Sequence, residues 1–357
     1  MKRKKMNVMI LPVGVSCNLN CKYCYHSGLV NTKVEVMPEN VLSRIIRGTT
    51  ELADDVDFFW HGGEPLLARE SFYRKALLMQ KETRFTGIVR NIIQTNATLI
   101  NDKWADFLTK NHFLIGVSID GPKSLHDLCR VNKGNKGTYN EVVRGVRKIQ
   151  ERQRNVGCIA LITRYNVCHP EEVWRNIRTL GISNLALHFC SSTRWGNSDE
   201  FMSSPKETVA FCKKLFNLWV KEDDPSFRIR NFVNVIRADN GSKPLDCAHQ
   251  SNACRFFIAI DQQGNAFPCH RFANDVTKRI GNINNQELKD ILDSSKEVYA
   301  EMAALPNDCK RCKHLKACGN GCAYERLIAN GLFRTKHPAC AINKNIIRHI
   351  QNWENKQ

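Results

Sequence analysis

The most informative stretch of this chain is Cys17-Asn-Leu-Asn-Cys21-Lys-Tyr-Cys24. Its three cysteines, spaced C-x3-C-x2-C, come directly after an apolar run that reads as the first strand. Three thiolates on one short loop can hold three irons of a [4Fe–4S] cube, which leaves the fourth iron open for a substrate. A zinc site with His26 as the fourth ligand is the alternative interpretation, and chance spacing is another.

Apolar runs alternate with amphipathic helical patterns through the first two thirds of the chain. This order predicts a parallel sheet with right-handed crossovers, and six units predict a partial barrel rather than a closed eightfold one. Loops at the carboxyl ends of the strands build the active site in such folds. The predicted strands are Val8–Val13, Val56–Trp60, Val89–Gln94, Leu114–Ile119, Cys158–Ile162 and Leu185–Phe189, and the predicted helices are Glu39–Gly48, Arg69–Thr83, Asp102–Asn111, Tyr139–Arg152 and Pro170–Leu180.

A second group of cysteines occupies the last third of the chain. After a linker-like segment, Arg237–Pro244, come eight of the sixteen cysteines, separated by hairpin and turn signals. We predict an α/β protein with two domains, a partial (β/α)6 barrel over residues 1–235 and a cysteine-rich domain over 236–357. Eight thiolates suffice for two fully ligated [4Fe–4S] clusters, and a structural zinc ribbon is the alternative.

The charge balance is strongly basic, with 53 Lys and Arg against 35 Asp and Glu and a formal net charge of +18. Such an excess favours a polyanionic partner: nucleic acid, an acidic peptide or an acidic redox protein. The basic residues are scattered apart from the block Lys2–Lys5, and neither paired zinc-finger histidines nor an RNA-binding signature is present. We therefore expect a protein partner and disfavour nucleic acid.

The N-terminus combines a basic start, Met1–Lys5, with an apolar run, Met6–Val15, as a short secretory signal does. Because Cys17 belongs to the cysteine motif, we prefer a first core strand behind a charged tail. No apolar run reaches the roughly eighteen residues of a transmembrane helix. Cysteines at metal-ligand spacing in a large chain favour a reduced, cytoplasmic metalloprotein over a disulfide scaffold.

The first cysteine motif, with Tyr23 before its last cysteine, resembles that of the radical S-adenosylmethionine (AdoMet) superfamily. The segment Trp60-His-Gly-Gly-Glu-Pro65 after the second strand resembles the Gly-Gly-Glu-Pro motif of that superfamily, which binds the amino group of the methionine moiety. The resemblance implies that an open cluster on Cys17, Cys21 and Cys24 cleaves AdoMet to a 5′-deoxyadenosyl radical. It implies that Ser118 meets the ribose of AdoMet and that Arg130 meets the carboxylate. The other residues that it implies bind AdoMet are Tyr23, Gly62, Gly63, Glu64, Thr95 and Asn96.

The last third of the chain resembles the SPASM extension of peptide-modifying radical enzymes. The resemblance rests on Cys254-x9-Gly264-x4-Cys269, Cys309-x2-Cys312-x5-Cys318-x3-Cys322 and Cys340. It implies three [4Fe–4S] clusters in all. The first auxiliary cluster is assigned to Cys247, Cys254, Cys269 and Cys322, and the second to Cys309, Cys312, Cys318 and Cys340. Without Cys247, the first would have an open iron. Of the five remaining cysteines, Cys158 and Cys190 are expected to be small core residues.

The implied reaction is an oxidative modification of a ribosomally made peptide, such as a thioether or carbon–carbon crosslink, with a flavodoxin- or ferredoxin-like electron donor. The alternative is an anaerobic sulfatase-maturating enzyme, which oxidises a Cys or Ser of a sulfatase to formylglycine. Those enzymes carry an Asp where this chain has His270, and tend to carry Gln where it has His61. We predict that His270 acts beside the substrate, with a pKa near 6.5. An iron–sulfur protein that binds nucleic acid is the alternative of another class.

Overall fold

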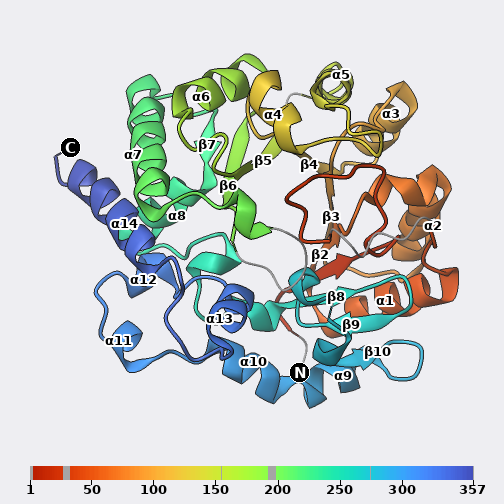
Figure 1. The fold of residues 1–357 in the computed structure, drawn as a ribbon. Coiled ribbons are helices and arrows are strands. Elements are labelled where there is room, and N and C mark those ends of the chain that lie inside the picture. Colours follow the sequence, from red (N-terminus) through yellow and green to blue (C-terminus); the bar gives the residue numbers. More distant parts are fainter. Residues whose placement is uncertain (1–2, 27–32, 154, 192–197, 274, 357) are drawn as a thin grey trace.

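The computed structural model of the chain describes residues 3–26, 33–153, 155–191, 198–273 and 275–356. Met1 and Lys2 of the basic start lie outside the described residues. Figure 1 shows helices arranged around the outside of a curved sheet, with the segment after about residue 240, in cyan to blue, between α1 and α7. None of the described helices combines the length and apolar character that a membrane span requires.

The described strands form one sheet in the order β10-β9-β8-β1-β2-β3-β4-β5-β6-β7. Every pair from β8 through β1 to β7 is parallel, and β8, β9 and β10 pair antiparallel. The predicted α/β partial barrel is therefore confirmed, with a short seventh strand added. The strands are β1 Met6–Ile10, β2 Asp55–Trp60, β3 Ile88–Thr95, β4 Leu114–Ser118, β5 Gly157–Ile162, β6 Asn184–Phe189, β7 Arg228–Ile229, β8 Phe257–Ile260, β9 Asn265–Phe267 and β10 Gly281–Asn282.

The first strand begins and ends earlier than predicted. It spans Met6–Ile10, all of it buried, and the chain then turns, with the Gly14 amide donating to the Leu11 carbonyl. Pro12 has no amide hydrogen to continue a ladder, so the strand ends before it. This early end leaves Leu11–Ser16 to carry the chain out to the cysteine motif.

The helices pack their apolar faces on the sheet. In α5, Val142, Gly145, Val146 and Ile149 are buried at the spacing of one helix face. The helices are α1 Glu39–Leu52, α2 Arg69–Glu82, α3 Asp102–Lys110, α4 Lys123–Cys129, α5 Tyr139–Gln150, α6 Pro170–Thr179, α7 Pro205–Glu222, α8 Arg230–Asp239, α9 Leu288–Ser294, α10 Lys296–Ala303, α11 Asn307–Lys310, α12 Leu315–Cys318, α13 Ala323–Asn330 and α14 Cys340–Glu354.

The cysteine-rich segment is joined to the barrel through the sheet itself. Strand β8 pairs along β1, and helix α8 crosses the predicted boundary between residues 235 and 236. Helix α14 returns to pack on α7 and α8. The division into two domains stays a prediction, but the parallel pairing of β8 beside β1 places the two cysteine-bearing parts of the chain at the same side of the sheet.

Candidate active site at the carboxyl edge of the sheet

The loop after β1 carries Cys17, Cys21 and Cys24 together. The amide of Cys24 donates to the carbonyl of Cys21, and the amide of Leu19 approaches Cys17 Sγ at 3.4 Å. Burial, and then the nearby Glu64 carboxylate, raise the pKa of Cys17 to about 12, and burial raises that of Cys21 to about 12. Ligation by iron removes the thiol proton, so these thiols are suited to a cationic metal centre.

The Gly-Gly-Glu-Pro segment after β2 packs directly on that loop. A Cβ at Gly62, where φ is +109°, would lie 2.3 Å from the Gly14 carbonyl oxygen, and one at Gly63 would lie 2.1 Å from that of Ser16. The Gly63 and Glu64 amides donate to these same two carbonyls. Only residues without a side chain allow this approach, so the two glycines set the distance between the cysteine loop and the end of β2.

Glu64 is fully buried and joins the ends of β2 and β3. Its carboxylate accepts hydrogen bonds from the Leu66 amide at 3.0 Å, the Thr95 hydroxyl at 2.7 Å and the Asn96 amide at 2.8 Å. Burial raises the pKa of Glu64 to about 7, although these hydrogen bonds oppose the shift. A carboxylate offers about four acceptor sites, so room for one further donor remains.

Thr95 and Asn96, at the end of β3, face the cysteine loop. The Asn96 amide group donates to Asn18 Oδ1 at 2.8 Å and approaches Cys17 Sγ at 3.8 Å. Ser118, at the end of β4, accepts a hydrogen bond from Gln94 at 3.1 Å. The predicted AdoMet contacts Glu64, Thr95 and Asn96 therefore lie around Cys17, while Ser118 lies one strand further along the edge.

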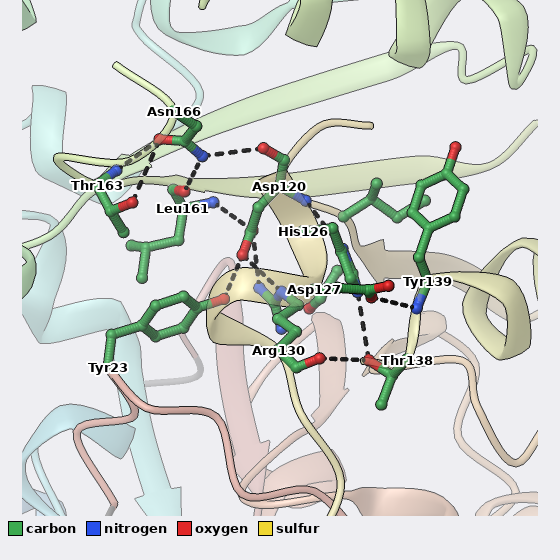
Figure 2. A network of polar contacts seen from close by, with 12 residues as sticks. Tyr23, Asp120, His126, Asp127, Arg130, Thr138, Tyr139, Leu161, Thr163 and Asn166 are labelled. Atoms are coloured by element: carbon green, nitrogen blue, oxygen red, sulfur yellow. Dashed lines mark hydrogen bonds and ion pairs between the residues drawn. The ribbon is translucent and has the colours of Figure 1, made fainter. Parts of the chain in front are cut away.

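Asp120 lies at the centre of a buried network beyond β4 (Figure 2), and sequence reasoning assigned it no role. Its carboxylate accepts from the Tyr23 hydroxyl, from Arg130 Nε and Nη2 at 2.8 and 3.1 Å, and from the Leu161 amide at 2.9 Å. Burial opposes the charge on Arg130, but Asp120, Tyr23 and Cys21 together outweigh burial and raise the Arg130 pKa. Two of the predicted AdoMet-binding residues, Tyr23 and Arg130, are thus held by one carboxylate.

The network continues on both sides of Asp120. Asn166 donates to the backbone carbonyl of Asp120 at 2.9 Å. The backbone amide of Asp120 lies 3.4 Å from Nδ1 of the buried His126, and His126 Nε2 meets the Thr138 hydroxyl. Nη1 of Arg130 takes no part in the pair with Asp120. Arg130 therefore keeps a nitrogen with which to meet an anionic group.

Histidines from four separate parts of the chain act on one another near the cysteine loop. The His270 ring lies 4.4 Å from the His61 ring and 6.3 Å from the Tyr25 ring, measured between centroids, and its Nδ1 lies 3.1 Å from Met9 Sδ. His26 and His188 act electrostatically on both. Burial, and then His26 and His188, lower the pKa of His61 to about 4.

The expectation of a His270 pKa near 6.5 is wrong. Burial, then the neighbouring His61 and Arg271, lower the pKa of His270 well below its usual value. The ring is therefore neutral at pH 7 and able to accept a proton or a hydrogen bond. Sequence reasoning missed His188 and Tyr25; a polar His inside the apolar run Leu185–Phe189 was the available signal.

The eight C-terminal thiols form two groups of four. Cys247, Cys254, Cys269 and Cys322 act electrostatically on one another, and so do Cys309, Cys312, Cys318 and Cys340. Among the described residues, no three His, Cys, Asp or Glu side chains are arranged to hold a single metal ion. A four-iron cube sets its ligands further apart than one ion does, so this finding is compatible with thiol groups of cluster size.

A chain of polar contacts joins these two groups. Arg271 Nη1 lies 3.8 Å from Cys322 Sγ and 2.6 Å from Glu325 Oε1, and Glu325 Oε2 lies 2.7 Å from His337 Nε2. Asn320 Oδ1 then accepts from the His337 amide at 3.0 Å and lies 3.5 Å from Cys309 Sγ. We call Arg271, Glu325, His337 and Asn320 the bridge between the two cysteine groups.

Comparison with known proteins identifies both halves of this arrangement. The Radical SAM superfamily matches residues 11–177, and the SPASM iron–sulfur cluster-binding domain matches residues 252–313. The serine-type anaerobic sulfatase-maturating enzyme of Bacteroides thetaiotaomicron is 30% identical over 348 residues, covering 90% of this chain and 84% of the relative. The cysteine-type enzyme of Clostridium perfringens is 28% identical, covering 89% and 88%.

Solved structures agree with the fold. The structure of anSMEcpe with bound AdoMet and the Cp18Cys peptide has a TM-score of 0.86 and 25% identity, covering 99% of this chain and 100% of that one. Streptococcus suis SuiB bound to its precursor peptide SuiA has a TM-score of 0.69 at 15% identity, covering 94% and 76%.

The fold and the cysteine loop thus define a radical SAM enzyme, whose domains imply iron–sulfur clusters and AdoMet. The chain belongs to the family of radical SAM proteins with a SPASM domain that contains the anaerobic sulfatase-maturating enzymes.

Proposed function

We propose that this chain is a maturase that oxidises a residue of a peptide or protein. The carrying observation is the three-cysteine loop of Cys17, Cys21 and Cys24, packed on Gly62 and Gly63 at the carboxyl edge of a parallel sheet. When bound there, a [4Fe–4S] cluster and AdoMet supply a 5′-deoxyadenosyl radical that takes a hydrogen atom from a substrate. Relatives that bind AdoMet with the same fold support this proposal.

The AdoMet-binding residues have distinct proposed roles. Tyr23, Gly62, Gly63, Thr95 and Asn96 shape the pocket beside the cysteine loop. Glu64 holds the ends of β2 and β3 together and offers an acceptor for an amino group. Arg130, oriented by Asp120, meets the carboxylate of the methionine moiety, and Ser118 meets the ribose.

We propose two auxiliary [4Fe–4S] clusters, one on each group of four C-terminal thiols, and three clusters in total. Their proposed role is to accept the second electron when the substrate is oxidised. All three clusters need reduced thiols, and the open cluster on Cys17, Cys21 and Cys24 needs a low-potential donor, which we propose is a flavodoxin- or ferredoxin-like protein in the cytoplasm. Nucleic acid is not proposed as a partner.

The proposed substrate is a peptide segment that reaches the histidines around His270. The similar structures with a bound Cp18Cys peptide and a bound precursor peptide support this class of substrate. His270 is proposed to accept a proton from the substrate or to position it, because its ring lies against His61 and Tyr25 near the cysteine loop. By the resemblance described for the sequence, it stands where sulfatase-maturating enzymes carry an Asp.

The preferred product is an oxidised or crosslinked peptide. By the resemblance, sulfatase maturases tend to carry Gln where this chain has His61 and carry Asp where it has His270. These two differences support a target residue other than the Cys or Ser of a sulfatase. Formylglycine formation on a sulfatase is the second candidate, which the 30% identity to a serine-type maturase supports.

The test is product analysis with two substrates under one set of anaerobic conditions. One is a precursor peptide encoded beside the gene, and the other is a pair of sulfatase peptides carrying Cys or Ser. A peptide that loses two hydrogens without gaining a hydrazine-reactive aldehyde supports the preferred product. An aldehyde on the sulfatase peptide establishes the second candidate, and AdoMet cleavage that never depends on any peptide contradicts both.

His270→Ala is expected to keep AdoMet cleavage and lose modified peptide. His349→Ala is the matched control, because this histidine lies on α14 and meets Asn217 instead. Equal product yields from the two variants would remove His270 from the reaction.

A further inference from the structure

We propose that the surface around the second group of C-terminal cysteines docks an acidic, flavodoxin-type one-electron carrier. We call it the second-cluster face and define it by Lys310, Arg311, Lys313, Lys316, Arg334, Lys336, Lys344 and Arg348. The inference rests on the proposed function, because it takes Cys309, Cys312, Cys318 and Cys340 as ligands of one cluster.

The charge of this segment is far more one-sided than that of the whole chain. Residues 307–348 contain nine Lys and Arg against two acids, Asp308 and Glu325, whereas the whole chain has 53 against 35. Arg326 and Glu325 are turned inward: Arg326 is 1% exposed, and Glu325 pairs with Arg271 and His337. What reaches the surface is eight basic side chains and Asp308.

The basic residues lie together in space although they come from separate loops and helices. Asp308 pairs with Lys336 at 2.5 Å and Arg311 at 4.0 Å, and Lys344 acts on it as well. The charges of Lys313, Lys344 and Arg348 act together on the buried His314, with Asp239 of α8 opposing them. Lys344 belongs to both sets, so the five residues of these two sets form one face, to which exposed Lys310, Lys316 and Arg334 of the same segment are assigned by sequence.

This face adjoins the second cysteine group. The charge of Lys336 acts on Cys309 and Cys340, which lie on α11 and at the start of α14. Cys312, Cys318 and Cys340 are each partly exposed. A partner docked on the face would come close to the thiols, which is what electron transfer between two proteins requires.

The bridge gives the electron a route from the interior to this face. It runs from Cys322 of the first group through Arg271, Glu325, His337 and Asn320 to Cys309 of the second. Its inner end, Arg271, acts on His188 and His270 beside the proposed substrate. The first group therefore faces the reaction and the second faces the basic surface.

The oxidation of the substrate balances in atoms and electrons. After a hydrogen atom has been removed, the substrate radical gives up one electron and one proton to become the oxidised product. The proton passes to a base or to water, and clusters held by the two cysteine groups would supply the path by which the electron reaches the docked carrier. The carrier is reduced by one electron, from the oxidised flavin to the semiquinone.

Charge complementarity selects the occupant. Flavodoxin-type carriers are acidic, and opposite charge raises association rates and orients the encounter. An acidic precursor peptide would also be attracted, but it must reach the AdoMet cluster at the carboxyl edge of the barrel to react. The position beside the second cysteine group therefore favours the electron carrier.

The test compares two variants that change the net charge equally. The face variant is Lys313→Glu, Lys316→Glu and Arg348→Glu, and the control is Lys81→Glu, Lys110→Glu and Arg147→Glu on the exposed surfaces of α2, α3 and α5. The affinity of each reconstituted enzyme for an acidic, FMN-loaded flavodoxin is measured at low and high salt. Iron content and AdoMet cleavage with a small chemical reductant are measured in parallel.

The face variant is expected to bind flavodoxin about tenfold or more weakly at low salt, with this difference lost at high salt. The control variant is expected to bind as the unaltered enzyme does. Equal weakening in both variants would assign the effect to total charge, and unchanged binding in both would exclude the face; either result overturns the proposal. So does a face variant that loses affinity for an acidic peptide but not for flavodoxin.

Two readouts separate this proposal from the proposed function. If the unaltered enzyme lacks the iron of the second cluster or does not cleave AdoMet, the proposed function has failed. If iron content and AdoMet cleavage are intact and the face variant binds flavodoxin as the unaltered enzyme does, only the proposed docking surface is wrong. A neutral triple variant, Lys313→Gln, Lys316→Gln and Arg348→Gln, repeats the binding assay with a smaller change in surface charge.

Discussion

At the scale of single residues, Asp120 orients the groups proposed to meet AdoMet. It is 3% exposed and accepts hydrogen bonds from Tyr23, Arg130 and Leu161. A buried guanidinium that loses its carboxylate is left with an uncompensated charge. The shape of the AdoMet pocket therefore depends on a residue that need not touch AdoMet.

Asp120→Asn is expected to destabilise the protein by about 3–5 kcal/mol, because it leaves Arg130 buried without its partner. AdoMet affinity should fall as well. Asp106→Asn is the control, because Asp106 pairs with Arg152 on the exposed surface and its loss should change little. Urea unfolding and AdoMet binding are the measurements, and equal unfolding midpoints for the two variants would contradict this role of Asp120.

His126 gives the same network a pH dependence. Burial lowers its pKa to about 4; Asp120 and Asp127 oppose this shift, and Arg130 and Lys123 add to it. The unfolded chain takes up this proton near pH 6.5, whereas the folded chain does so only near pH 4. Stability is therefore expected to fall as the pH drops through this window, by about 3 kcal/mol in full.

The measurement is the free energy of unfolding of the unaltered protein and of His126→Gln between pH 7 and pH 5.5. The unaltered protein should lose more stability on acidification than the variant does. Parallel curves would show that His126 does not carry this dependence.

What could be predicted at this scale follows from the chemistry of the residues. Closely spaced cysteines and a Gly-Gly-Glu-Pro segment are enough to predict a site for a cluster and AdoMet. The partners of Asp120 lie at positions 23, 130 and 161, and the histidines at 26, 61, 188 and 270 meet only because strands bring them together. No local pattern contains such contacts, and none shows the burial and the His61 neighbour that lower the pKa of His270.

At the scale of elements, the contact between two loops organises the site. The Gly62–Gly63 segment lies so close to Val13–Ser16 that a Cβ at Gly63 would approach backbone atoms of Val15 and Ser16 within 2.5 Å. Backbone cannot move aside as the end of a flexible side chain can. The geometry of the cysteine loop is therefore tied to the end of β2.

Gly63→Ala is expected to displace the cysteine loop and reduce iron binding at Cys17, Cys21 and Cys24. Gly157→Ala in β5 is the matched control, because a Cβ there would meet its nearest atom at 3.6 Å, an ordinary contact. Iron content and AdoMet cleavage are the measurements. A Gly63→Ala enzyme that binds and cleaves AdoMet normally would show that the close approach is not required.

The bridge is the second feature at this scale, and it predicts a redox effect. Arg271 places a positive charge 3.8 Å from Cys322 Sγ. Arg271→Gln removes the charge and should lower the midpoint potential of the first auxiliary cluster by on the order of tens of millivolts. A redox titration followed by electron paramagnetic resonance measures it, with Lys316→Gln as control, and an unchanged potential would contradict the effect.

The elements that form most of the barrel were predictable, whereas α4, α7, α8 and the helices of the last third were not predicted. The six main strands and five helices fall where period and apolar runs place them, within a few residues at each end. Strand β7 and the short strands β8 to β10 were not predicted, because two to four residues carry too little pattern. The pairing of β8 with β1 is a long-range contact that no local signal encodes.

At the scale of the whole molecule, the basic surface and the proposed cluster sites lie along one path through the protein. The cysteine loop and the histidines lie at the carboxyl edge of the sheet, and the bridge leads from there to the second-cluster face. The basic residues are scattered in the sequence, whereas folding brings Arg311, Lys313, Lys336, Lys344 and Arg348 together beside one cysteine group. The net charge of +18 therefore contains a local feature that composition alone does not show.

The central claim is that Cys17, Cys21 and Cys24 hold the cluster that cleaves AdoMet, and one experiment tests it most directly. The unaltered enzyme and a variant with all three cysteines changed to Ala are reconstituted anaerobically, and iron and 5′-deoxyadenosine are measured. We predict about twelve irons and 5′-deoxyadenosine from the unaltered enzyme, and about eight irons without 5′-deoxyadenosine from the variant. A variant that still produces 5′-deoxyadenosine would contradict the claim.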